Sequence, residues 1–99
     1  MKHLTVKDVG QLHATRSIIA QIDSDANFRI FINTSLRRYT SCDWGDLPSS
    51  DSALNDSAVK TGNDRILAKY IYPTNPELSI YIITEQDRSS TTIMFTDEY

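Results

Sequence analysis

The last third of the chain, residues 65–99, contains three runs rich in β-branched and aromatic residues, separated by two short polar breaks. This spacing constrains the fold most, because such runs predict strands and short breaks favour pairing between neighbours. The predicted strands are Arg65–Tyr72, Leu78–Glu85 and Thr91–Phe95. Prolines in the first break prevent the first two runs from forming one long strand.

The second predicted strand is apolar on both faces, because Ile82 and Ile83 point to opposite sides of a sheet. A strand of this kind is typical of a central position. We therefore expect an antiparallel β-meander of three to four strands. A short strand at Gln11–Ala14 is expected to join it at an edge.

Helical patterns fill most of the first 62 residues. Ser17 is the predicted N-cap of a first helix that carries Ile18, Ile19 and Ile22. Asn27 is the predicted N-cap of a second helix, the strongest of the three. Its apolar stripe repeats at helical spacing and consists of Phe28, Phe31, Ile32, Ser35, Leu36 and Tyr39.

A loop over residues 41–52 leads to a third predicted helix, roughly residues 51–61. Its inward side is expected to include Ala53, Leu54 and Ala58, and Gly62 fits a left-handed stop. The fold class is therefore α+β, with about three helices packed on one face of the meander. Ninety-nine residues make a single domain, mainly helical over 1–62 and a β-meander over 63–99.

Charge is unevenly distributed along the chain, whose formal net charge is −3. Residues 1–39 carry an excess of Lys and Arg, whereas residues 40–64 carry five Asp against Lys60. An acidic balance weighs against direct nucleic-acid binding, because phosphate contacts need a basic patch. A protein partner or a small ligand fits the composition better, and an exposed edge strand would allow a homodimer.

The sequence signals no cofactor and no metal site. One Cys and two His at unrelated spacing do not form a metal-ligand pattern, and no dinucleotide or phosphate-loop motif is present. No secretory signal and no run of about 20 apolar residues is visible, so a cytoplasmic protein that does not enter the membrane is expected. A hydrolase using Asp46 and Glu85 is the least favoured reading, and we expect no catalysis.

The break between the second and third strands is the first candidate binding site. Residues 84–92 hold two carboxylates, one guanidinium and five hydroxyls. Arg88 and the hydroxyls could cradle a nucleotide or another phosphate compound. The same groups could instead satisfy the backbone of a hairpin turn. The candidate residues here are Thr84, Glu85, Asp87, Arg88 and Thr92.

Four further candidate residues lie elsewhere in the chain. Trp44 either caps the core or offers a partner an aromatic anchor. Asp46 follows it in the same acidic loop. Asn55 and Arg65 have either a structural role or a role in the same site. A binding site built from all of these would join the loop, the third helix and the polar turn.

Residues 43–99 resemble a family of small bacterial proteins carried on plasmids, phages and other mobile elements, some labelled as related to type I restriction–modification. The resemblance rests on Trp44-Gly45-Asp46, Asn55, Gly62, Arg65-Ile66-Leu67, Tyr70, Ile82-Ile83-Thr84-Glu85, Asp87-Arg88-Ser89, Thr91-Thr92 and Glu98-Tyr99. Tyr81 stands where the family usually has Trp, and Thr96 where Pro is common. Residues 1–42 match poorly.

The resemblance implies an accessory protein of a mobile element. In that setting we expect an anti-defence inhibitor, of the anti-CRISPR or anti-restriction type, that binds a host or mobile-element protein. The alternative is a nucleotide-binding or other small-molecule-binding protein that uses the polar turn at Thr84–Thr92.

Overall fold

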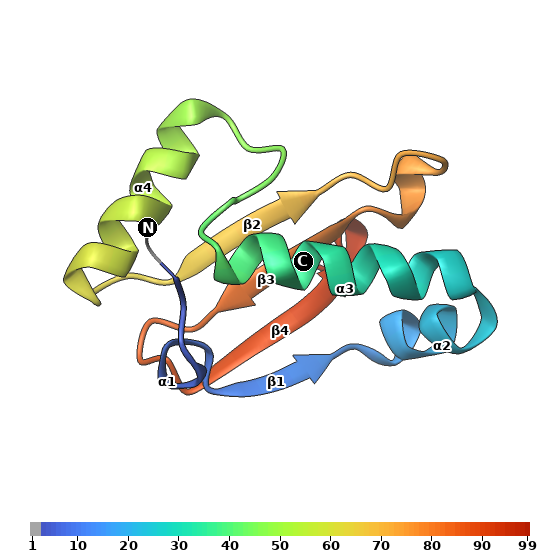
Figure 1. Cartoon of the computed structure of the whole chain (residues 1–99), viewed down its shortest axis with the longest axis horizontal. Helices are drawn as coiled ribbons and strands as arrows, with labels where there is room; N and C mark the ends of the chain where they lie inside the picture. The colour runs from blue at the N-terminus through green and yellow to red at the C-terminus, as the bar shows by residue number, and fades with distance from the viewer. Residues whose placement is uncertain (1–2) are drawn as a thin grey trace.

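The computed structural model describes residues 3–99 and forms one α+β unit around a four-stranded sheet (Figure 1). The strands occur in the order β1-β4-β3-β2. Their bounds are Gln11–Ala14 for β1, Ile66–Tyr70 for β2, Ile80–Thr84 for β3 and Ser90–Phe95 for β4. The α+β class and a short edge strand at Gln11–Ala14 are thus confirmed.

The expected purely antiparallel meander is wrong, because β1 runs parallel to β4. The other two pairs are antiparallel, so the sheet is mixed. The chain leaves the C-terminal end of β1 directly into helices that pack on the sheet, and this crossover is what a parallel neighbour requires. Gly10 enables the approach, since a Cβ there would overlap the carbonyls of Arg88 and Ser89.

Helices α2 (Arg16–Ser24) and α3 (Ala26–Thr40) lie on one face of the sheet (Figure 1). Their N-caps are Thr15 and Asp25, whose side chains accept hydrogen bonds from Ile18 N and from Phe28 N. Ser17 and Asn27 were therefore the wrong caps, each by two residues. The structure selects the residue whose oxygen lies just before the first free N–H groups.

The core lies between α3 and the sheet. The expected α3 stripe is buried at Phe28, Ile32, Ser35 and Tyr39. Facing it are alternate residues of the three long strands, as the two-residue period of a strand requires. They are Ile66, Ala68, Tyr70, Ile80, Ile82, Thr84, Thr91, Ile93 and Phe95.

Helix α4 (Ser49–Thr61) lies beside the outer edge of β2, and Gly62 ends it in the left-handed conformation, as expected. Its expected inward side is partly wrong, since Leu54 is 67% exposed whereas Asn55 and Ala58 are buried. The structure also has a short helix α1 (Val6–Val9) and two 3-10 turns, η1 (Pro76–Leu78) and η2 (Thr96–Glu98). Among residues 3–99, no helix is both long and apolar enough to cross a bilayer.

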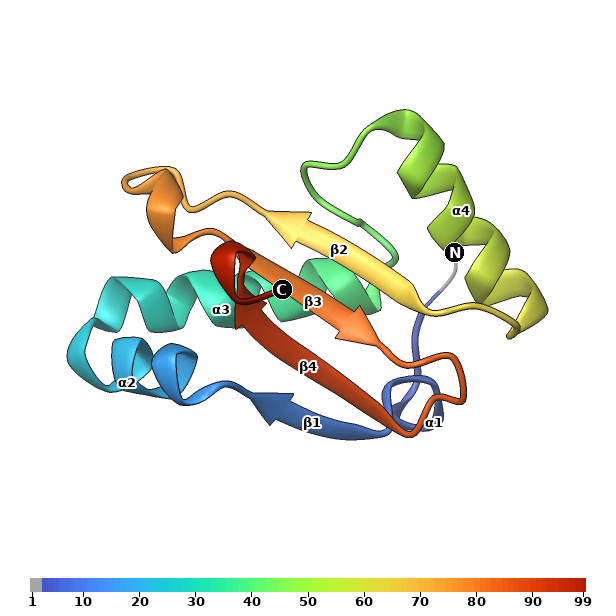
Figure 2. The ribbon, with the colours of Figure 1, turned by 180° about the vertical axis from the view of Figure 1, so that it is seen from behind.

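The opposite face of the sheet is turned to the viewer in Figure 2, with α2 and α3 behind it. Its side chains include Leu67, Ile83 and Thr92, which lie in one row across three strands. The C-terminal residue Tyr99 returns over this face, where its ring packs against Tyr81 at a centroid distance of 5.6 Å. This face therefore carries mixed apolar and aromatic side chains.

Candidate functional site

Asn55 binds the outer edge of β2. Its Nδ2 donates to the Leu67 carbonyl at 2.7 Å, and its Oδ1 accepts from the Leu67 N–H at 3.2 Å. The side chain thus copies the pairing that a neighbouring strand would supply. Because Asn55 is only 5% exposed, its amide is engaged with the chain itself rather than turned to a ligand.

The loop that contains Trp44 and Asp46 closes the next part of the same edge. The Lys69 N–H donates to the Trp44 carbonyl at 3.2 Å, and the Asp46 N–H donates to the Lys69 carbonyl at 2.7 Å. Asp46 Oδ2 then accepts from the Ile71 N–H at 3.0 Å. Every outward-facing amide of this edge from Leu67 to Ile71 therefore has a partner.

Gly45 permits this contact between the loop and the strand. It adopts a φ of 77°, and a Cβ added there would overlap the Lys69 carbonyl and meet the Tyr70 ring at 2.7 Å. A side chain at this position is therefore excluded by both conformation and space. The Trp-Gly-Asp sequence is therefore explained by the hydrogen bonds that this loop makes with the edge of β2.

The Trp44 indole is a core residue. It is 4% exposed, packs edge-on against Tyr39 at 5.5 Å, and donates from Nε1 to Asp56 Oδ1 at 2.9 Å. A buried indole normally needs such an acceptor. Of the two sequence interpretations, the structure favours the core cap over the partner anchor.

Arg88 ties three segments together through its guanidinium. Nη2 donates to the Ala58 carbonyl in the last turn of α4 at 2.9 Å. Nη1 donates to the Asp64 carbonyl at 2.6 Å and also reaches the carbonyls of Glu85 and Gln86. A cation at a helix C-terminus is favourable. The fork that the sequence offered to a phosphate is occupied by backbone oxygens.

Thr84 belongs to a buried row of hydrogen-bonded hydroxyls on the face of the sheet that packs against α3. Its Oγ1 lies 2.5 Å from Tyr39 Oη and 2.6 Å from Thr91 Oγ1, and Thr91 donates to the Val9 carbonyl at 2.7 Å. Burial raises the pKa of Tyr39, so this phenol keeps its proton. These hydrogen-bonded hydroxyls connect α3 and the segment before β1 to the two central strands, β3 and β4.

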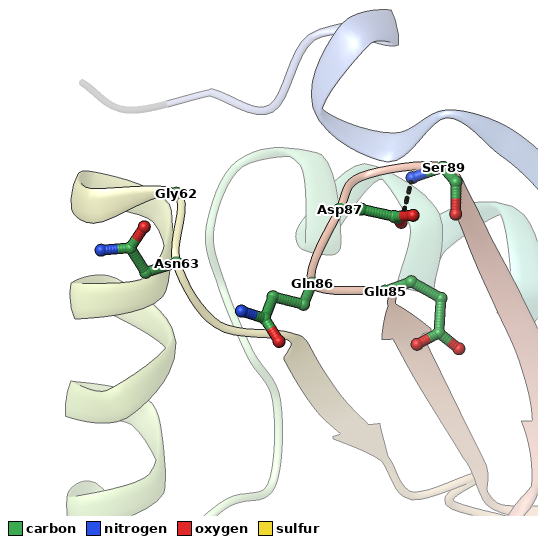
Figure 3. A pocket seen from close by; sticks show the side chains of 6 residues that line it. All are labelled: Gly62, Asn63, Glu85, Gln86, Asp87 and Ser89. Atoms are coloured by element: carbon green, nitrogen blue, oxygen red, sulfur yellow. Dashed lines mark hydrogen bonds between the residues drawn. The ribbon is translucent and has the colours of Figure 1, made fainter.

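The β3–β4 turn borders a shallow open hollow of about 620 Å³ next to the end of α4 (Figure 3). Its lining residues are Gly62, Asn63, Glu85, Gln86, Asp87 and Ser89. The Ser89 side chain lowers the pKa of Asp87, and so does the Ser89 N–H, which donates to Asp87 Oδ1 at 2.9 Å. Two carboxylates and no cationic lining side chain make this hollow unsuitable for a phosphate.

A second concavity of about 470 Å³ lies between α4 and β2. Three leucines form its apolar part, namely Leu47, Leu54 and Leu67. Its polar lining consists of Asp51, Asn55, Asp64 and Arg65. We call this surface the α4–β2 groove. Sequence reasoning missed this groove, because helical periodicity places Leu54 on the buried side of α4.

The other sequence candidates are distributed over several surfaces. Arg65 lines the α4–β2 groove, and its guanidinium lies 5.4 Å from the centre of the Tyr99 ring. Thr92 pairs with Ile83 and therefore lies on the face of the sheet that the helices leave open. Asp46 and Glu85 lie toward opposite ends of β2, so the structure does not bring this pair together.

Residues 3–99 contain no group of three or more His, Cys, Asp and Glu side chains placed to hold a metal ion. Comparisons of the chain with protein-family models, curated proteins and solved structures find no match.

Proposed function

We propose that this chain is a non-catalytic binding protein that engages a protein partner through the α4–β2 groove. In this proposal it serves a mobile element in the bacterial cytoplasm by inhibiting a host restriction or CRISPR-type system. The biological setting comes from the family resemblance of residues 43–99. The choice of surface comes from the geometry described above.

The observation that carries the choice of surface is the exposure of Leu54. A leucine that is 67% exposed next to two partly buried leucines leaves apolar area open to water. Apolar area of this kind, bordered by polar groups, is typical of a protein-interaction site. A partner side chain placed between α4 and β2 would cover it.

The charge around the groove indicates the chemistry of the partner. Asp51 and Asp64 lie in its lining against one cation, Arg65. The surrounding segment, residues 40–64, carries five Asp and one Lys. A complementary partner surface presents an apolar anchor with Lys or Arg beside it, because opposite potentials speed and orient association. Nucleic-acid-binding enzymes commonly offer such basic surfaces.

The alternative, a nucleotide-binding protein at Thr84–Thr92, has weaker support. Arg88 would have to release four carbonyl partners before it could bind a phosphate. The neighbouring carboxylates of Glu85 and Asp87 would oppose an anion. Binding of a protein partner at the α4–β2 groove does not require Arg88 to release its partners and does not bring an anion next to these carboxylates.

Phage plating tests the proposal. The protein is expressed in hosts that each carry one restriction or CRISPR-type system, and phage plating efficiency is compared with and without it. We expect plating to rise in at least one host and to fall back with Leu54→Glu. Ile30→Glu is the matched control, since Ile30 is similarly exposed, at 63%, on α3 away from the groove.

Both variants change an exposed side chain, so stability is expected to move by less than about 0.5 kcal/mol. Loss of an anchor contact costs roughly 2 kcal/mol of binding free energy, which corresponds to about a thirtyfold weaker complex. Unchanged plating in every host contradicts the anti-defence role. Equal activity of Leu54→Glu and Ile30→Glu contradicts the assignment of the groove.

A further inference from the structure

The two edges of the sheet differ in how their backbone groups are satisfied. The β2 edge is closed by Asn55, Trp44 and Asp46, as described above. The other edge is β1, which forms one side of the molecule in both views (Figures 1 and 2). No described element beyond β1 pairs with it.

Hydrogen-bond geometry defines which β1 groups are open. Gln11 N donates to the Ser89 carbonyl and Thr15 N donates to the Ile93 carbonyl, so these residues point their backbone groups toward β4. Because a strand alternates, Leu12 and Ala14 direct their N–H and C=O groups away from the sheet. The edge thus presents two donors and two acceptors in a fixed extended array.

Natural edge strands are usually protected by short length, a lysine, a proline, a bulge or a covering element, and β1, with four residues, has only the first of these. The β1 sequence Gln-Leu-His-Ala contains neither lysine nor proline, and three of its four residues are exposed. Leu12 is 55% exposed although its side chain is on the helix-covered side of the sheet. The complement of such an edge is another extended strand.

We propose that the strand that covers this edge is β1 of a second copy of the chain. The two strands pair antiparallel about a two-fold axis that passes between the two His13 residues. Leu12 of one copy then exchanges both of its backbone hydrogen bonds with Ala14 of the other, and the reverse pair is identical. Four inter-chain hydrogen bonds form, and the two sheets become one sheet of eight strands.

The side chains of β1 are complementary to themselves in this register. On the helix-covered side, the large Leu12 lies opposite the small Ala14 of the second copy, so the leucine gains cover without a clash. On the open side, the two His13 side chains lie next to each other. β1 itself carries no Asp, Glu, Lys or Arg, so its two copies meet without like-charge repulsion.

The flanks of the strand are compatible with the same arrangement. Antiparallel pairing brings the segment before β1, which contains Lys7 and Asp8, next to the segment after β1 of the other copy, which begins with Arg16. The first segment is neutral in sum, and Asp8 offers a carboxylate to that arginine. Closed two-fold pairing also explains how such an edge avoids open-ended aggregation.

The mass of the protein in solution is the first test. Light scattering over a wide range of protein concentration should show the transition from 11.2 kDa to twice that mass. Leu12→Lys places a charge on the edge and should shift the transition to at least tenfold higher concentration. Ile19→Lys is the control, because Ile19 is also about half exposed but lies on α2.

Cysteine cross-linking tests the register. In a background with Cys42→Ser, His13→Cys should form an inter-chain disulfide rapidly, because directly opposed residues have Cα atoms about 4.5–5.5 Å apart. Gln11→Cys is the control, because Gln11 is also exposed and lies on the same side of the same strand. Its two copies would lie more than about 10 Å apart in this register, so it should cross-link poorly.

A dimer that is weakened by Leu12→Lys and cross-linked through position 13 supports the proposal. A monomer at all concentrations overturns it, as does a dimer that Leu12→Lys leaves unchanged. Faster cross-linking at position 11 than at position 13 overturns the register. Circular dichroism of each variant establishes that the fold is retained.

Discussion

Replacing Asn55 by Ala removes both side-chain hydrogen bonds to Leu67 while leaving α4 intact. The change should destabilise the protein far more than an ordinary surface substitution. Two lost hydrogen bonds contribute about 1 kcal/mol each, and leaving partly buried N–H and C=O groups without partners adds to this. We expect a loss of about 2–4 kcal/mol in the free energy of unfolding, before correction for helix propensity.

This loss is large against a total stability of roughly 5–15 kcal/mol for a chain of this size. Urea unfolding measures it, with fluorescence of the single tryptophan, Trp44, as the signal, since this indole is buried in the folded state. A fall in melting temperature of about 4–8 °C per kcal/mol should accompany it.

Asn33→Ala is the matched control, because Asn33 is exposed on α3. Both substitutions replace Asn by Ala within a helix, so both gain about 0.5 kcal/mol of helix propensity. Subtracting one result from the other isolates the contact with β2. If the two variants differ by less than about 0.5 kcal/mol, the edge-closing role of Asn55 is refuted.

Three further predictions concern Arg88, Gly45 and Asp43, and each is measured by the same urea titration. Arg88→Lys should lower the free energy of unfolding by about 1–3 kcal/mol, because an ammonium cannot reach α4 and the β3–β4 turn at once. An unchanged free energy of unfolding contradicts the tethering role of Arg88. Gly45→Ala should destabilise the protein more than Gly62→Ala. Both glycines have a positive φ, but a Cβ at Gly45 would overlap β2, whereas nothing lies within 4 Å of a Cβ at Gly62. Equal losses of unfolding free energy would mean that the loop is not in tight contact with β2. Arg38 donates to Asp43 and lowers the pKa of this carboxyl. The pair therefore stabilises the fold above the unfolded Asp pKa of about 3.9, and the contribution is lost as pH falls through the lower folded value. Asp43→Asn should remove less than about 1 kcal/mol at neutral pH, because both side chains are about half exposed, and this loss should shrink as pH falls through that range. A loss that stays the same as pH falls contradicts this reasoning.

Periodicity in the sequence was sufficient to predict the strands of residues 65–99 and the buried stripe of α3. Both patterns report burial over a continuous segment, which is a local property. The parallel pairing of β1 with β4 was not predictable in this way. It depends on contacts between residues far apart in the chain, and four residues at Gln11–Ala14 carry too little pattern to specify a partner.

The candidate site illustrates a different limit. Polar groups that bind a ligand and polar groups that bind the chain's own backbone are the same side chains, so the composition of residues 84–92 could not separate the two roles. Arg88 and Asp87 proved to bind nearby backbone groups. The rotation of α4 was hidden for a related reason, because periodicity places Leu54 inward whereas the β2 edge needs the amide of Asn55.

Amide hydrogen exchange is the most direct test of whether Asn55, Trp44 and Asp46 close the β2 edge. We expect strong protection of the Leu67, Lys69 and Ile71 amides, whose acceptors are Asn55 Oδ1, the Trp44 carbonyl and Asp46 Oδ2. Protection at Leu67 should fall selectively in Asn55→Ala. Exchange of these three amides as fast as in an unfolded chain would mean that the β2 edge is open.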